Sequence, residues 1–144
     1  SLTGASYNFN EVGQDFKRYF IELGRLQPSA SVLDVGCGAG RMALPLTDYL
    51  TTGQYFGMDI IEPSVQWCQA HITPTYENFK FEHSNIFNRF YNPNGDVLAK
   101  NYIFPFQDGS FDFVFLTSVF LTSTGLLGVT VVFGTGFTSF FLSI

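Results

Sequence analysis

The fold is decided by one stretch of the chain, Ser31-Val-Leu-Asp-Val-Gly-Cys-Gly-Ala-Gly-Arg41. It begins with a short apolar run that carries one acid, Asp34, and it ends in glycines at positions 36, 38 and 40. This pattern predicts a buried strand that turns sharply into a helix. Glycine tolerates positive φ and lets a backbone come close to a ligand, so the turn predicts a small-molecule site at the carboxyl end of this strand.

The acid and the glycine spacing indicate the class of ligand. A dinucleotide-binding loop reads G-x-G-x-x-G, whereas this turn has glycine at every second position from 36 to 40 and Arg41 where the third glycine would fall. A carboxylate at Asp34 would repel pyrophosphate and attract an ammonium group. The turn therefore favours a ligand with a cationic end.

The next segments predict alternating strands and helices. Gln54–Asp59 reads as a second strand that ends in an acid, and such a carboxylate can accept hydrogen bonds from ribose hydroxyls. An acid just before Pro63 also fits the cap of the following helix, which is the alternative for Asp59. Phe79–His83 alternates apolar and charged residues, which is typical of an edge strand with one solvated face.

The segments around this core differ in character. Residues 8–24 predict an amphipathic helix that begins at an asparagine cap, Asn8 or Asn10. Residues 88–106 form an insertion rich in turn signals and aromatic side chains. Residues 121–144 contain no charged residue and predict two strands around a turn, which either close the sheet or pair with another chain.

Two motifs resemble those of class I S-adenosylmethionine-dependent methyltransferases. Asp34-Val-Gly-Cys-Gly-Ala-Gly40 is similar to their D/E-x-G-x-G-x-G signature, and Pro105–Val114 is similar to their PF-x-DGS-FD-x-V pattern. The resemblance runs from about Phe9 to Phe120 and then ends. It implies a Rossmann-like α/β fold, doubly wound, with a mostly parallel sheet in the order 3-2-1-4 followed by carboxyl-terminal strands, truncated relative to a full methyltransferase domain.

The resemblance also implies a cofactor, S-adenosyl-L-methionine, and the residues around it. Turn residues would hold its methionine part, the acid at the end of the second strand its ribose, two isoleucines would flank adenine, and an asparagine would bond the adenine edge. In that order these are Asp34, Gly36, Cys37, Gly38 and Gly40, then Asp59, then Ile60 and Ile86, then Asn85; Leu116 completes the cofactor site from the fourth strand.

These features predict a single cofactor-binding domain over residues 1–144, with its core at 31–120. The expected function is methyl transfer to an acceptor that the sequence does not identify, without a metal and with the catalytic residue unknown. One alternative is a module that binds the cofactor without turnover. A NAD-dependent oxidoreductase is a further alternative, which Asp34 and Arg41 disfavour.

Composition narrows the expected partners and location. The net charge of −5 and a charged fraction of 13% give no broad surface for phosphates, so we expect no nucleic-acid partner. The hydroxyls and glycines scattered through the uncharged tail disfavour a membrane span and leave self-association through its strands as an expectation. The two cysteines show no disulfide or metal spacing, which predicts a reducing, cytoplasmic setting.

Overall fold

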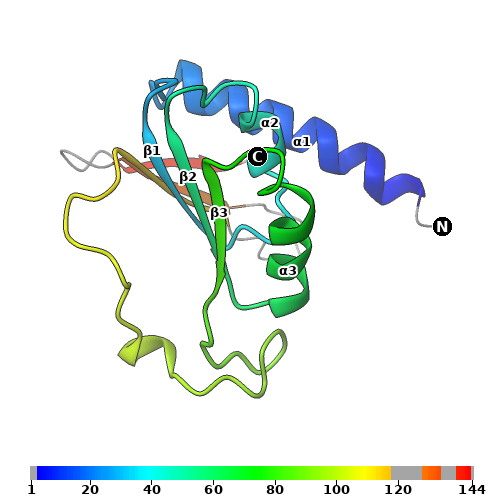
Figure 1. The fold of residues 1–144 in the computed structure, drawn as a ribbon, viewed down its shortest axis with the longest axis vertical. Helices are drawn as coiled ribbons and strands as arrows, with labels where there is room; N and C mark the ends of the chain where they lie inside the picture. The colour runs from blue at the N-terminus through cyan, green and yellow to red at the C-terminus, as the bar shows by residue number, and fades with distance from the viewer. Residues whose placement is uncertain (1–2, 118–127, 134–138, 144) are drawn as a thin grey trace.

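The computed structural model describes residues 3–117, 128–133 and 139–143, and within these ranges six strands form one sheet (Figure 1). The strand order is β3-β2-β1-β4-β5-β6, which confirms the predicted order 3-2-1-4. The first four strands are parallel, whereas β5 runs antiparallel to β4, and β6 antiparallel to β5. Their bounds are β1 Ser31–Val35, β2 Gln54–Asp59, β3 Phe79–His83, β4 Phe113–Thr117, β5 Gly128–Phe133 and β6 Ser139–Ser143.

Three α-helices of the described chain lie on the same side of the sheet (Figure 1). They are α1 (Thr3–Glu22), α2 (Ala43–Leu46) and α3 (Glu62–His71), and a short 3₁₀ helix, η1, covers Ala99–Asn101. None of the helices in the described ranges is both long enough and apolar enough to cross a membrane.

The amino-terminal helix is longer than the sequence predicted. It begins at Thr3, so the predicted cap at Asn8 or Asn10 is wrong and both residues lie inside the helix. Residues 3–7 contain no proline, so this stretch is compatible with the longer helix. Phe20 on its inner face is 1% exposed, and its ring centroid lies 4.5 Å from that of Phe115 on β4.

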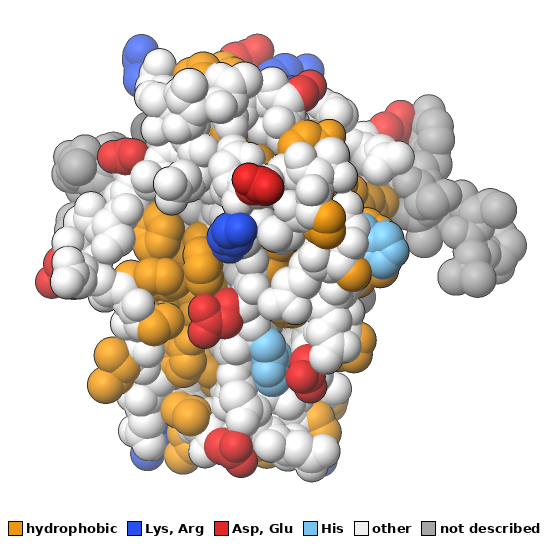
Figure 2. Space-filling view, viewed as in Figure 1, with side chains coloured by type: hydrophobic (Ala, Val, Ile, Leu, Met, Phe, Trp, Pro, Cys, Tyr) orange, Lys and Arg blue, Asp and Glu red, His pale blue; other side chains and the backbone are white. Residues whose placement is uncertain are grey.

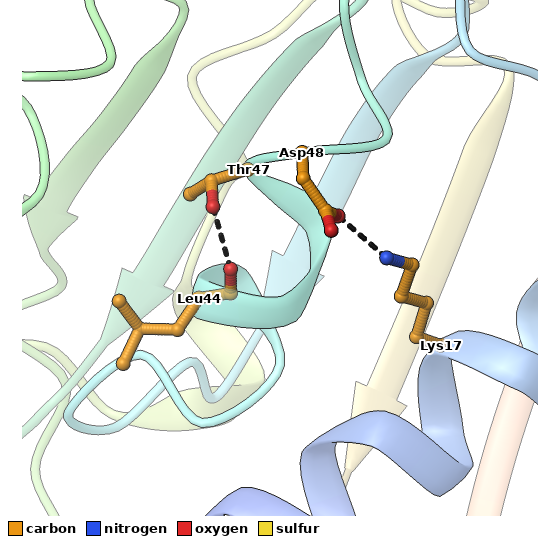
Figure 3. A network of polar contacts seen from close by, with 4 residues as sticks. All are labelled: Lys17, Leu44, Thr47 and Asp48. Carbon is orange, nitrogen blue, oxygen red and sulfur yellow. Dashed lines mark hydrogen bonds and ion pairs between the residues drawn. The ribbon is translucent and has the colours of Figure 1, made fainter.

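The helix after the glycines has only four residues. Pro45 lies in its first turn, where a missing backbone N–H removes no intrahelical hydrogen bond, so the proline is compatible with this short helix. After it, the hydroxyl of Thr47 donates to the carbonyl of Leu44 at 2.7 Å, and Asp48 forms an ion pair with Lys17 of α1 (Figure 3). These contacts close the short helix and join it to α1.

The core fills the space between the three helices and one face of the sheet. Apolar side chains of β1, β2, β3 and β4 on this face meet buried residues of all three helices. The core residues are Phe16, Phe20, Leu26, Ala30, Val32, Cys37, Met42, Ala43, Leu46, Leu50, Tyr55, Val65, Cys68, Ile72, Phe79, Phe81, Phe113 and Phe115.

The segment 84–112 runs round the other side of the sheet (Figure 1). Phe106 packs edge-on against Phe56 of β2 and against Phe111, with centroids 4.9 Å apart in both pairs. Other apolar side chains of this segment face solvent, with Phe90 at 82% and Ile103 at 85% exposure. Figure 2, drawn in the same view as Figure 1, shows a cluster of apolar side chains on the surface left of centre.

Candidate functional site

The glycine turn, residues 36–41, joins β1 to the segment that leads into α2 at the carboxyl edge of the parallel strands. Its three glycines have φ values of 90°, 53° and 80° in chain order. Positive values of this kind strain a residue with a Cβ, so each position favours glycine. The backbone N–H groups of Gly36 and Cys37 donate to the carbonyl of Met58 at 2.7 and 3.0 Å, which fixes the turn against β2.

Two of the glycines meet different surroundings. A Cβ on Gly40 would lie 2.7 Å from Cδ1 of Ile72 and 3.2 Å from Sγ of Cys68, so here the turn packs directly on α3 and the residue after it. A Cβ on Gly38 would meet no heavy atom within 4 Å. Gly38 therefore borders open space, where a ligand can approach the backbone.

Asp59 ends β2 beside the glycine turn and is 8% exposed. Its Oδ2 accepts a hydrogen bond from the N–H of Gly38 at 2.7 Å, and its Oδ1 accepts one from the N–H of Ile61 at 2.8 Å. The second bond spans two residues and lies just before α3, whose N-cap residue is Ile61; it does not cap the helix, so the structure does not show the capping role considered as the alternative for this acid. Each carboxylate oxygen can accept a further hydrogen bond, so these two bonds are compatible with a ribose site.

Asp34 lies within β1 and is fully buried, at 0% exposure. Its Oδ2 accepts a hydrogen bond from the hydroxyl of Tyr55 on β2. Its Oδ1 is buried and has no hydrogen-bond partner among the described residues. The acid is therefore covered by protein, as expected for a residue of a buried strand.

The ionisation of Asp34 reflects this burial. Burial raises the pKa of the carboxyl to about 7, and the hydrogen bond from Tyr55 opposes that rise. The negative charge of Asp59 raises the pKa and the positive charge of Arg41 lowers it, so both charges act on the buried acid. Added positive charge nearby would stabilise the ionised form.

Cys37 lies in the turn with its side chain in the core, at 5% exposure. A Cβ on Gly57 of β2 would lie 3.0 Å from its Sγ. Burial raises the pKa of the Cys37 thiol and raises that of Cys68 to about 11, so both stay protonated at neutral pH. Cys37 thus contributes its backbone, rather than its thiol, to the surface of the turn.

Asn85 follows β3 and is exposed. Its Nδ2 donates to Oδ2 of Asp96 at 2.7 Å, and its Oδ1 accepts a longer bond of 3.4 Å from Asn92. Both partners belong to the insertion, which therefore folds back onto the strand tip. The sequence did not indicate that Asp96 places a carboxylate beside Asn85.

Three apolar residues expected near the cofactor lie at the carboxyl ends of three strands. Ile60 follows β2, Ile86 follows β3, and Leu116 lies near the end of β4. The two isoleucines are half-buried, whereas Leu116 is 41% exposed. All three are therefore at the edge of the sheet that carries the glycine turn.

The amino-terminal helix approaches the turn closely. A Cβ on Gly13 of α1 would lie 2.5 Å from the carbonyl oxygen of Arg41, so only glycine allows this contact. The Arg41 guanidinium lies 5.9 Å from the ring centroid of Phe9 in α1, within range of a cation–π interaction. α1 thus covers part of the turn and holds its one basic side chain.

A cavity of about 350 Å³ opens at the opposite edge of the sheet. Its lining includes residues at the amino ends of β1, β2 and β3, together with Phe106 and Phe111. Because ligands of open α/β sheets bind at the carboxyl ends of the strands, the glycine turn remains the candidate site. Among the residues the structure describes, no group of His, Cys, Asp and Glu could hold a metal ion.

Sequence reasoning missed the partner of Asp34. Tyr55 lies in an apolar strand, where a tyrosine hydroxyl needs a hydrogen-bond partner when it is buried. The position of Tyr55 in this strand was therefore a signal that its hydroxyl has a partner. Identifying that partner as Asp34 required the register of β1 on β2, in which Val32 is opposite Tyr55.

Comparison with known proteins places this geometry in a family. A family model described as a methyltransferase domain matches residues 26–129, which include the glycine turn and β1 to β4. This chain belongs to the methyltransferase domain family. The match begins before β1 and runs into β5, so all residues singled out at the carboxyl edge fall within it.

Two solved structures show the same fold at low sequence identity. The YcgJ protein from Bacillus subtilis is 22% identical with a TM-score of 0.52, over 74% of this chain and 38% of that one. A SAM-dependent methyltransferase from Aquifex aeolicus is 24% identical with a TM-score of 0.51, over 69% of this chain and 46% of that one. This methyltransferase-family chain thus matches less than half of the length of either structure.

Proposed function

We propose that this chain binds S-adenosylmethionine at the glycine turn and takes part in transfer of its methyl group to an acceptor. The observation that carries the proposal is the turn itself, where open space at Gly38 lies beside the carboxylate of Asp59. Membership in a methyltransferase family indicates S-adenosylmethionine as the cofactor.

The residues present fit such a cofactor. Asp34 has a buried oxygen with no hydrogen-bond partner in the described ranges, and the ammonium and sulfonium groups of S-adenosylmethionine are both cationic. Asp59 has acceptor capacity left for ribose hydroxyls. Ile60 and Ile86 are half-buried just after β2 and β3, which supports the proposal that they flank adenine, and Asn85 with Asp96 offers polar groups for its edge.

The same geometry disfavours a pyrophosphate. A dinucleotide site needs free backbone N–H groups at the turn and a helix N-terminus behind it. In this turn the N–H groups of Gly36, Cys37 and Gly38 already donate to Met58 or Asp59. The following helix has only four residues, so it offers little of a helix dipole.

The chain's contribution to methyl transfer is positioning. Bound S-adenosylmethionine supplies a methyl group already activated by its sulfonium. Because the cofactor would supply this activated group, no nucleophile on the protein is required. The turn and Asp59 would hold the cofactor in line with the acceptor, and the insertion would exclude water.

We propose an apolar or planar acceptor, bound between Leu116 and the insertion 88–106. Leu116 is 41% exposed at the carboxyl edge, and the insertion exposes Phe90, Tyr91 and Phe104. Residues 118–120, expected to continue this surface, lie outside the described residues. We also propose a reducing, cytoplasmic setting, which the unpaired thiols of Cys37 and Cys68 support.

Calorimetric titration with S-adenosylmethionine, S-adenosylhomocysteine and NAD tests the proposal. We expect heat of binding from both adenosyl ligands and none from NAD. Asp59→Ala should weaken adenosyl binding by about 1.5–3 kcal/mol, the usual contribution of hydrogen bonds to a charged group. Product formation with a panel of aromatic and aliphatic acceptors would then separate a transferase from a module that only binds the cofactor.

Asp108→Ala provides the matched control. Asp108 is an exposed acid that precedes β4, at the opposite edge of the sheet from the glycine turn. Its removal changes the net charge by the same amount as removal of Asp59, and we expect it to leave affinity unchanged. Binding of NAD alone, or equal effects of the two substitutions, would contradict the proposed site.

A further inference from the structure

A buried hydroxyl lies beside the acid of the methyltransferase motif. Tyr55 is 1% exposed, and its ring stacks on Phe79 with centroids 5.0 Å apart. A buried tyrosine hydroxyl needs a hydrogen-bond partner, and this one donates to Oδ2 of Asp34. The packing of the ring therefore fixes the position of one carboxylate oxygen.

The other carboxylate oxygen of Asp34, Oδ1, accepts no hydrogen bond from the described residues. Oδ1 is buried and lacks a hydrogen-bond partner within the described ranges, and an ionised carboxylate in this state is costly. The titratable groups that act on Asp34 come from β2, the turn and α3. They are Tyr55, Asp59, Arg41, Cys37 and Cys68. Arg41 is the one cation in this set, so an ammonium group from a ligand would add positive charge where the ionised acid lacks it.

We propose that Tyr55 is a positioning residue of the cofactor site: its hydroxyl favours the ionised, oriented carboxylate of Asp34, whose charge attracts the ammonium group of the S-adenosyl ligand. This inference rests on the proposed function. The hydrogen bond stabilises the charged form of the acid, and the low dielectric around a buried charge strengthens its attraction for a nearby cation. Affinity for the ligand should therefore rise with pH as Asp34 loses its proton.

The test compares two ligands on two proteins. S-adenosylhomocysteine carries the ammonium group, whereas 5′-methylthioadenosine has the same nucleoside without the amino acid. For the wild type, we expect S-adenosylhomocysteine affinity to rise several-fold between about pH 6 and about pH 8, and 5′-methylthioadenosine affinity to stay level. In Tyr55→Phe, the rise in S-adenosylhomocysteine affinity should move to higher pH, because the carboxyl of Asp34 loses a hydrogen bond to its ionised form. At pH 7 we expect this ligand to bind about tenfold more weakly than to the wild type, and at alkaline pH we expect its affinity to be restored.

Tyr49→Phe is the matched control, because it removes a hydroxyl that donates to the carbonyl of Leu26 at 2.6 Å instead of to Asp34. It should leave both affinities and both pH profiles unchanged. An equal loss of both ligands at every pH in Tyr55→Phe would make Tyr55 purely structural and overturn the inference.

The pH profiles of ligand affinity in the wild type test the inference even if Tyr55→Phe does not fold. Level pH profiles for both ligands would overturn the role of Tyr55 and Asp34 while leaving the proposed cofactor site intact. If neither adenosyl ligand binds the wild type at any pH, the proposed function itself fails, and this inference fails with it.

Discussion

At the scale of single residues, two glycines of the turn have different structural roles. Gly40 allows close packing on Ile72 and Cys68, whereas Gly38 borders open space beside Asp59. Both have positive φ, so an alanine at either position carries backbone strain. They differ in what the added methyl group would touch.

This difference predicts two phenotypes. Gly40→Ala should lower the free energy of unfolding by about 2–4 kcal/mol, because strain is added to overlap with Ile72. Gly38→Ala should cost about 1–2 kcal/mol of stability but weaken S-adenosylhomocysteine binding more strongly, because its methyl group enters the ligand's space. Denaturant unfolding and calorimetry on both variants check this pair. Equal losses of stability with unchanged affinity in Gly38→Ala would contradict the assignment of the open space.

The buried acid predicts how stability depends on pH. The pKa of Asp34 is about 7 in the folded chain and near 3.8 when unfolded, so the folded state binds more protons between these values. The contribution of Asp34 to stability is therefore largest at acid pH and falls as pH rises toward 7, by roughly 4 kcal/mol at 1.36 kcal/mol per pH unit.

Asp34→Asn removes this titration. The difference in unfolding free energy between the variant and the wild type should shift in favour of the variant as pH rises from about 4 to about 7. Urea denaturation at several pH values measures it. A difference that does not change with pH would show that Asp34 is not buried in its neutral form at low pH.

The sequence was informative at residues whose neighbours along the chain define their setting. The turn glycines, Asp34 and Asp59 follow a local pattern, and the structure brings them to one edge of the sheet. The partners Tyr55 and Asp96 could not be predicted, because they meet Asp34 and Asn85 through strand register and the folding of the insertion.

At the scale of elements, strands were easier to predict than helix ends. The predicted second and third strands, Gln54–Asp59 and Phe79–His83, match β2 and β3 residue for residue. The alternation of apolar and charged residues indicates β3, whereas β2 is a mostly buried run that ends in an acid. Helix boundaries failed because they depend on small differences in propensity. α1 extended past its expected cap, and α2 ends after four residues.

α1 offers a test of which face is packed. Phe20 is 1% exposed and packs against Phe113 and Phe115, whereas Leu23, the residue after the helix, is 56% exposed. Phe20→Ala should lower the free energy of unfolding by about 3–5 kcal/mol, and Leu23→Ala by less than about 0.5 kcal/mol. Chemical denaturation of both variants checks this. Similar losses would mean that α1 does not pack on the sheet through Phe20.

At the scale of the whole molecule, the described helices lie on one side of the sheet and the aromatic insertion on the other (Figure 1). Strand order placed β1 at the centre, so the glycine turn and the tip of β2 meet at the carboxyl edge. The order followed from the family resemblance. The close approach of α1 to Arg41 did not, because no local pattern fixes where an amino-terminal helix crosses a turn.

The most direct test of the account is an amide NMR titration with S-adenosylhomocysteine, because it locates the ligand without a known acceptor. We predict the largest chemical-shift changes at residues 36–40 and 59–61, around the turn and the acid of β2. Changes confined to Gln54, Asn78 and Ser110, which line the cavity at the opposite edge, would contradict the assigned site.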